Sequence, residues 1–179
     1  MKRIYAFLCV CLLLLTGCAP TAPTQEERAA LSQMSTVIDG AFFCTPQELV
    51  DVINNAATND ESGLALQLSN YTAPGASIYL ANGSSSVILT LEESDAGMLN
   101  DVRLYWSIGA NDLNEQYSVG LYCGTIIGLL APDHAEQVSD SFNEIFSTGY
   151  GSVEFDFDEI HVAYMAIDGK NWLDVEIAE

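Results

Sequence analysis

IHVAYMAIDGKNWLDVEI, the sequence of residues 160–177, predicts a β-hairpin with one apolar face. Asp168-Gly169 is a two-residue turn signal, because both central residues of a type I′ turn need a positive φ. This turn pairs apolar residues on one face: Ile160–Ile177, Val162–Val175 and Tyr164–Leu173. The opposite face then carries the pairs His161–Glu176, Ala163–Asp174 and Met165–Trp172. A slip of one residue would expose the apolar set, so the pattern fixes the register.

Strand signals continue towards the N-terminus of this hairpin. Residues 64–68 alternate apolar with small or polar side chains, and residues 72–76 turn through Pro74-Gly75. Residues 77–81 and 84–91 flank Asn82-Gly83, a strong short-hairpin signal. In the next strand, alternate residues form an apolar face: Val102, Leu104, Trp106 and Ile108. A final group of strands is expected from about residue 152 onwards.

Three helices are expected, at residues 46–57, 113–130 and 133–147. Thr45 and Glu48 form a capping-box pattern around Pro46. In the second helix, glycines recur at every fourth residue (Gly120, Gly124 and Gly128), which predicts a buried helix that a neighbouring element approaches closely. The third helix has an inward set, comprising Val138, Phe142, Ile145 and Phe146, and an outward acidic set, comprising Asp133, Glu136, Asp140 and Glu144. Gly149 is the expected C-cap.

The order of these elements predicts an α+β fold. It consists of one helix, about four strands, two helices and about three strands. The simplest arrangement is a mostly antiparallel sheet with about three helices packed on one face, in a single domain from residue 33 to residue 179.

The N-terminal segment has the organisation of a secretory signal. Lys2 and Arg3 precede the uncharged apolar run Ile4–Leu15, and small residues then lead to a cysteine. Leu15-Thr16-Gly17-Cys18 resembles the lipobox of bacterial lipoprotein precursors. The resemblance implies that residues 1–17 are a signal peptide and that Cys18 carries acyl chains. The alternative is an ordinary signal peptide whose cleavage site includes a cysteine.

The resemblance also implies a location, the extracytoplasmic face of the cell membrane, to which lipid on Cys18 holds the protein. Two acyl chains anchor a protein stably, whereas a single chain holds it only marginally. Residues 18–32 contain prolines and polar side chains, and we interpret them as a lipidated tether between the bilayer and the domain.

The chain is strongly acidic, with a formal net charge of −20, and removal of Lys2 and Arg3 with the signal would take it to −22. Such a charge repels nucleic acids and anionic headgroups and favours basic partners. We therefore expect no nucleic-acid partner. The simplest role of the charge is solubility. The oligomeric state does not follow from the sequence.

No catalytic or cofactor signature is present. The only histidines, His134 and His161, lie in no nucleophile–histidine motif, and no cofactor is expected. His161 is expected to face Glu176 across the hairpin, either as a solvated pair or as a pH-responsive site. Two carboxylate-rich segments are candidates for weak calcium binding, but neither has the spacing of a calcium loop: Asp156, Asp158 and Glu159, and Glu92, Glu93 and Asp95.

Two further sites leave alternatives open. Cys44 and Cys123 are expected either to form a disulfide, in an oxidising compartment, or to be buried free thiols. Arg103 is expected to form an ion pair within the protein, or else to bind a ligand carboxylate together with Tyr105.

These observations favour a lipid-anchored, non-enzymatic binding or interaction module. The acidic helix face of Asp133, Glu136, Asp140 and Glu144 is the surface that the sequence predicts for a basic ligand, and a solvated face is its simpler interpretation. A small cell-envelope hydrolase or transferase is the alternative class, and a calcium-responsive module is a third. The enzyme would be marked by a converging cluster of Ser, His and Asp.

Overall fold

The computed structural model describes residues 25–73, 76–81, 85–107 and 113–178. The predicted signal peptide, Cys18 and the first part of the predicted tether lie outside these residues, as do the turn signals at 74–75 and 82–83. The helices are α2 (Gln25–Gln33), α3 (Pro46–Thr58), α4 (Leu113–Leu130), the 3₁₀ turn η1 (Pro132–His134) and α5 (Ala135–Thr148). The strands are β1 (Val37–Ile38), β2 (Ala41–Phe42), β3 (Leu68–Ala73), β4 (Ala76–Ala81), β5 (Val87–Glu93), β6 (Leu99–Ser107), β7 (Gly151–Phe157), β8 (Ile160–Ile167) and β9 (Lys170–Ile177).

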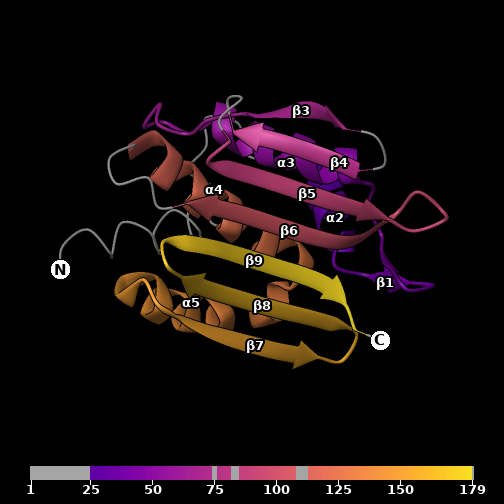
Figure 1. Cartoon of the computed structure of the whole chain (residues 1–179). Coiled ribbons are helices and arrows are strands. Elements are labelled where there is room, and N and C mark those ends of the chain that lie inside the picture. The colour runs from indigo at the N-terminus through magenta and orange to yellow at the C-terminus, as the bar shows by residue number, and fades with distance from the viewer. Residues whose placement is uncertain (1–24, 74–75, 82–84, 108–112, 179) are drawn as a thin grey trace.

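Seven strands form one antiparallel sheet in the order β3-β4-β5-β6-β9-β8-β7. The predicted hairpin is confirmed in its register, because Ile167 pairs with Lys170 and Ile160 with Ile177. Asp168 and Gly169 both have positive φ, as the predicted turn type requires. Pairing of β6 with β9 joins the two meanders into one sheet (Figure 1).

Helices α3, α4 and α5 cover one face of this sheet (Figure 1). Alternate residues of the strands point into the core between sheet and helices, and the largest of them are almost inaccessible to solvent: Leu89, Leu104, Tyr164 and Leu173. Tyr122 and Ile126 of α4 are equally buried. The predicted α+β fold, with an antiparallel sheet and helices on one face of a single domain, is therefore confirmed.

The local signals for α3 and the end of α5 are also confirmed. The Thr45 hydroxyl accepts a hydrogen bond from the Glu48 amide, and the Glu48 carboxylate accepts one from the Thr45 amide at 2.8 Å. Gly149 ends α5 in the left-handed region, with φ of 69°.

The strand expected at residues 64–68 begins only at Leu68, because helix side chains take the hydrogen bonds of the preceding backbone. The Leu66 amide donates to Ser118 Oγ at 2.8 Å, and its carbonyl accepts from the Tyr122 hydroxyl. The strand expected from residue 84 begins instead at Val87, since Leu80 pairs with Ile88. Ser85 and Ser86, expected in the strand, lie in a turn before it.

Three expectations about α4 and α5 are corrected. The helix expected from Asp133 begins at Ala135, after the 3₁₀ turn that follows Ala131. Phe146, expected inward, is 37% exposed, and its ring stacks against Phe142. A Cβ atom added at Gly128 would meet nothing within 4 Å, so no neighbouring element approaches closely at that glycine.

Two N-terminal elements were not predicted. Helix α2 occupies Gln25–Gln33, so the second half of the segment interpreted as a tether is helical, and Leu31 packs against the core. Strands β1 and β2 form a small hairpin around Asp39 and Gly40, both with positive φ. Asp39-Gly40 is itself a hairpin signal, and this signal could have revealed the hairpin.

Candidate functional site

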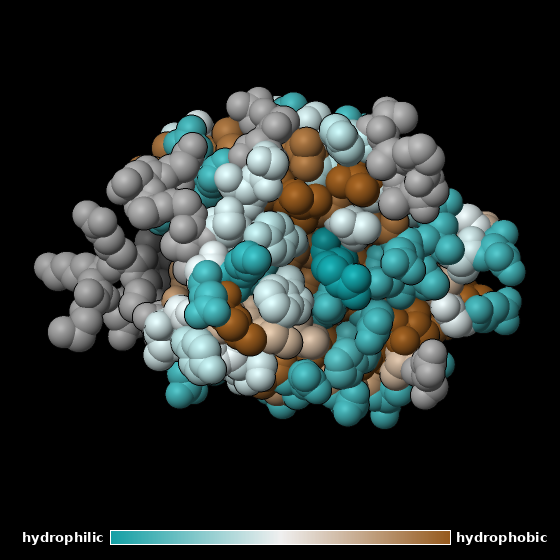
Figure 2. All heavy atoms as spheres, viewed as in Figure 1, coloured by the Kyte–Doolittle hydropathy of each residue, from teal (hydrophilic) through white to brown (hydrophobic). Residues whose placement is uncertain are grey.

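The face of the sheet opposite the helices is the main candidate site, and we call it the open face. On β6 it carries Asp101, Arg103 and Tyr105, which alternate with the buried Val102 and Leu104. Figure 2 shows hydrophobic side chains at several places on the surface of this face, interspersed with hydrophilic ones. The same strands thus supply a closed core on one side and an accessible mixed surface on the other.

One line of residues crosses five neighbouring strands of the open face, and we call it the apolar row: Leu80, Ile88, Tyr105, Trp172 and Met165. Each member is directly paired with the next in the ladder, and all five are partly exposed. Cross-strand pairs of this kind are in side-chain contact range. The row is therefore a continuous band that is not covered by the helices.

A second line lies nearer the other end of the strands, and we call it the acidic row: Glu92, Asp101, Glu176, His161 and Asp156. The predicted pairing of His161 with Glu176 holds in the backbone ladder. The imidazole, however, contacts Asp156 on β7, with 2.7 Å between Nδ1 and Oδ1. The bonded partner of His161 is therefore Asp156, because the neighbouring strand on the other side also presents a carboxylate.

Arg103 lies between the two rows and pairs with carboxylates of the protein itself. Its Nε donates to Asp174 Oδ1 at 2.6 Å, and Nη2 lies 3.6 Å from Asp101 Oδ2. The guanidinium is therefore in an internal ion pair, which is the first of the two predicted alternatives. Its side chain is 48% exposed, so the pair lies at the surface.

Asp101 is the most perturbed carboxyl of the open face. Its pKa is raised to about 6, chiefly by burial; Arg103 opposes this rise, whereas Asp174, Glu92 and Glu176 add to it. Its Oδ1 atom is buried and accepts no hydrogen bond. The row thus holds more negative charge than its nearby cation balances.

The structure brings the predicted ligand-contact residues together in part. Arg103, Tyr105, His161 and Glu176 all lie on the open face. The acidic helix set lies on η1 and α5, on the other side of the sheet, and its four members are exposed as predicted: Asp133, Glu136, Asp140 and Glu144. The two groups therefore cannot form one site.

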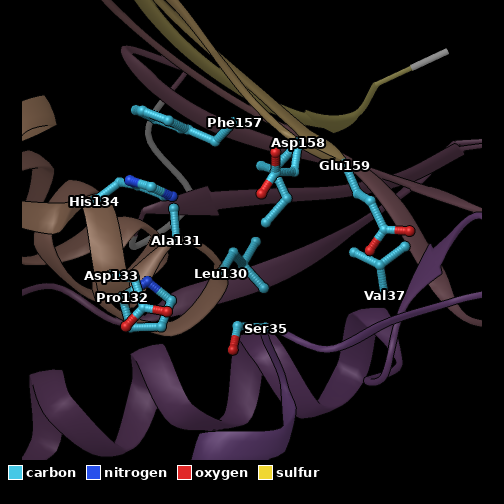
Figure 3. A pocket seen from close by; sticks show the side chains of 11 residues that line it. Ser35, Val37, Leu130, Ala131, Pro132, Asp133, His134, Phe157, Asp158 and Glu159 are labelled. Carbon is cyan, nitrogen blue, oxygen red and sulfur yellow. The ribbon is translucent and has the colours of Figure 1, made fainter.

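A shallow hollow of about 260 Å³ is the second candidate site. It lies between the turn that joins β7 to β8 and the segment Ser35–Val37, with Leu130 between them (Figure 3). On one side, His134 stacks flat on Phe157 with 3.8 Å between ring centroids. Asp133, Asp158 and Glu159 add carboxylates to its lining.

This hollow contains Ser35, His134 and Asp133, the residue types expected of a hydrolase. Their side chains do not converge: His134 lies against Phe157, while Ser35 lies beyond Leu130 (Figure 3). Within the described part of the chain, no hydrogen bond joins the three. A nucleophile needs a base within hydrogen-bond reach, so these three residues are not arranged as a catalytic triad.

Neither predicted calcium segment forms a recognisable metal site. Across residues 25–73, 76–81, 85–107 and 113–178, no three His, Cys, Asp or Glu side chains are placed to hold a metal ion. Asp156 and Asp158 fall on a strand and in the following turn, which separates their carboxylates.

The two core cysteines are free thiols, both buried. The Cys44 carbonyl accepts from the Leu99 amide at the start of β6. Cys123 lies near Tyr164, whose ring stacks on Trp106 close to the other end of β6. Burial also raises the pKa of the Cys44 thiol to about 12. Of the two predicted alternatives, a disulfide or buried free thiols, the structure thus has the free thiols, which are inert when buried in the core.

No protein-family model, curated protein or solved structure matches this chain. No helix in the described part of the chain is both long and apolar enough to cross a bilayer. The function is therefore inferred from the residues of the open face.

Sequence reasoning missed part of this site. The alternation within the final hairpin placed Met165 and Trp172 opposite the core, but their row continues through Tyr105, Ile88 and Leu80. The missing link is the pairing of β6 with β9, two strands separated by both large helices. No turn signal encodes such a long-range pairing.

Proposed function

We propose that this protein is a lipid-anchored extracytoplasmic module that binds a protein partner through the open face and catalyses no reaction. The observation that carries the proposal is the apolar row, which lies beside the acidic row on a sheet whose other face packs against α3, α4 and α5. Exposed apolar patches rimmed by polar residues are typical of interaction sites.

The residue types of the open face support this proposal. Tyr105, Trp172, Met165 and Arg103 belong to the types enriched at protein interfaces. Tyrosine and tryptophan are also enriched among binding hot spots, and they bury a large area with few rotatable bonds. A broad, seven-stranded surface suits a folded partner better than it suits a small molecule, which needs a concave pocket.

The proposed location rests on the N-terminal sequence. The signal architecture and the lipobox-like Leu15-Thr16-Gly17-Cys18 favour acylation of Cys18. Acyl chains would hold the domain beside the membrane, where an exposed sheet face is accessible to other envelope proteins.

Site-specific crosslinking tests the proposed surface. A photoreactive amino acid replaces Tyr105 in the full-length, membrane-attached protein. The control carries it at Gln137, an exposed position on α5. We expect a discrete protein adduct from position 105 and none from position 137. An adduct from position 137 alone, or from neither position, would contradict the proposed surface.

Cys18→Ser tests the anchor. We expect this variant to leave the membrane fraction, or to accumulate as unprocessed precursor, because serine cannot form the thioether to lipid. Fractionation and intact-mass measurement would distinguish the two. Normal processing with unchanged membrane attachment would refute lipidation at Cys18.

A further inference from the structure

The two rows of the open face set the shape of what can bind there. The apolar row crosses five strands and is therefore about 19 Å long at about 4.8 Å per strand. Asp101 lies four residues before Tyr105 on β6, so the rows are about 14 Å apart at about 3.4 Å per residue. Each row runs across the strands, and the two rows run side by side.

The open face is large enough for a stable protein contact. Seven strands of six to nine residues form the sheet, which corresponds to a face of about 700 Å² from standard strand spacings. A typical specific interface buries about 800 Å² on each partner. The area therefore matches a protein partner or a protein segment.

The charges on this face are unequal. Carboxylates lie on four strands, and the set comprises Glu92, Asp101, Glu154, Asp156, Asp174 and Glu176. The cations are Arg103, which Asp174 and Asp101 already contact, and Lys170 at the start of β9. Burial and the neighbouring carboxylates together raise the pKa of Asp101, as expected where negative charge is in excess.

This excess charge excludes several occupants. A second copy of the chain would bring the same carboxylates face to face, and anionic lipid would be repelled in the same way. A purely apolar partner would cover the acidic row without compensating its charge, which costs free energy. Charge complementarity therefore favours a basic partner.

We infer that the open face binds a basic protein segment whose apolar side chains contact the apolar row and whose lysine or arginine side chains reach the acidic row. This inference rests on the proposed function and specifies the partner's chemistry. The spacing of the rows requires the partner's basic groups to lie to one side of its apolar groups, about 14 Å away. Lysine and arginine can span part of that distance with their own aliphatic stems.

A defined peptide tests the inference. The probe is an amphipathic peptide of leucine and lysine, about 18 residues long, which would span about 27 Å as a helix. It is titrated into the full mature protein in neutral detergent at physiological salt. Trp172 on the apolar row reports binding by fluorescence, because the other tryptophan, Trp106, is only 4% exposed. We expect saturable binding that changes the Trp172 emission, and no such change in Trp172→Phe.

Matched variants separate the open face from general charge attraction. Glu92→Gln combined with Glu176→Gln should weaken peptide binding about tenfold. Glu136→Gln combined with Glu144→Gln removes the same charge from exposed positions on α5 and should change binding less than twofold. Equal weakening by both pairs, or a larger effect of the α5 pair, would overturn the inference.

Two control peptides test the partner's chemistry. Replacement of lysine by glutamate should abolish binding, and replacement of leucine by serine should weaken it about tenfold. The inference would also be overturned if one of these replacements left binding unchanged. It would equally be overturned if the original peptide did not bind. If position 105 still crosslinks to a protein in the membrane, the proposed function stands and only the basic character of the partner is wrong.

Discussion

The two faces of the sheet differ although the same strands build both. On the inner face, Leu104, Leu173 and Tyr164 are almost inaccessible, because α4 and α5 lie over them. On the open face, the neighbouring residues Tyr105, Trp172 and Met165 are only partly buried. The inner face is apolar throughout its centre, whereas the open face combines the apolar row and the acidic row. One face therefore stabilises the fold, while the other retains side chains that stability alone does not explain.

The largest expected difference between the faces is in packing energy. Leu173→Ala should lower the free energy of unfolding by about 2 to 5 kcal/mol, because it opens a cavity in a closed core. Trp172→Ala changes the adjacent residue on the open face and should cost less than half as much. Urea unfolding followed by circular dichroism measures both. Equal losses would mean that the open face contributes as much to stability as the core does.

A pH-dependent effect should follow from Asp101. Its pKa is raised from 3.8 to about 6 in the folded state, chiefly by burial. Its ionisation therefore disfavours folding. The protonated Asp101 carboxyl contributes favourably to the free energy of unfolding below pH 4. This contribution is lost as the pH rises through about 6 and stays lost above that. The side chain is only 14% exposed, and two pKa units correspond to about 3 kcal/mol.

Asp101→Asn should remove this titration. The free energy of unfolding of the variant, minus that of the wild type, should rise between pH 4 and pH 7 by about 2 to 3 kcal/mol. Urea unfolding at both pH values measures it, with Glu136→Gln on exposed α5 as the control. A difference that stays constant between the two pH values would show that Asp101 does not titrate in this range.

The smallest expected effect is that of the surface ion pair. Arg103→Gln should cost about 1 kcal/mol or less, because Arg103 is half exposed and water competes for its charge. The loss should shrink further in 1 M salt, where exposed charges are screened. Lys170→Gln, at the start of β9, is the control. A loss that is large and insensitive to salt would mean that Arg103 organises the open face rather than simply neutralising it.

Local signals account for much of the agreement between sequence and structure. The turn at Asp168-Gly169, the capping box at Thr45 and Glu48, and the C-cap at Gly149 each depend on residues close in the chain. The disagreements have non-local causes. The expected strand begins only at Leu68 because side chains of α4 take the hydrogen bonds of Leu66, and His161 contacts Asp156 because β7 lies beside β8.

The sequence by itself determined the α+β class, the hairpin register, the net charge and the lipobox-like motif at Cys18. These properties follow from alternation, turn chemistry and composition, all of which are local or additive. Only the tertiary structure decided that β6 pairs with β9, which joins Tyr105 to Trp172 and Asp101 to Glu176. That pairing brings together residues about 70 positions apart in the sequence, and a contact over such a distance depends on the packing of the whole domain rather than on any local signal.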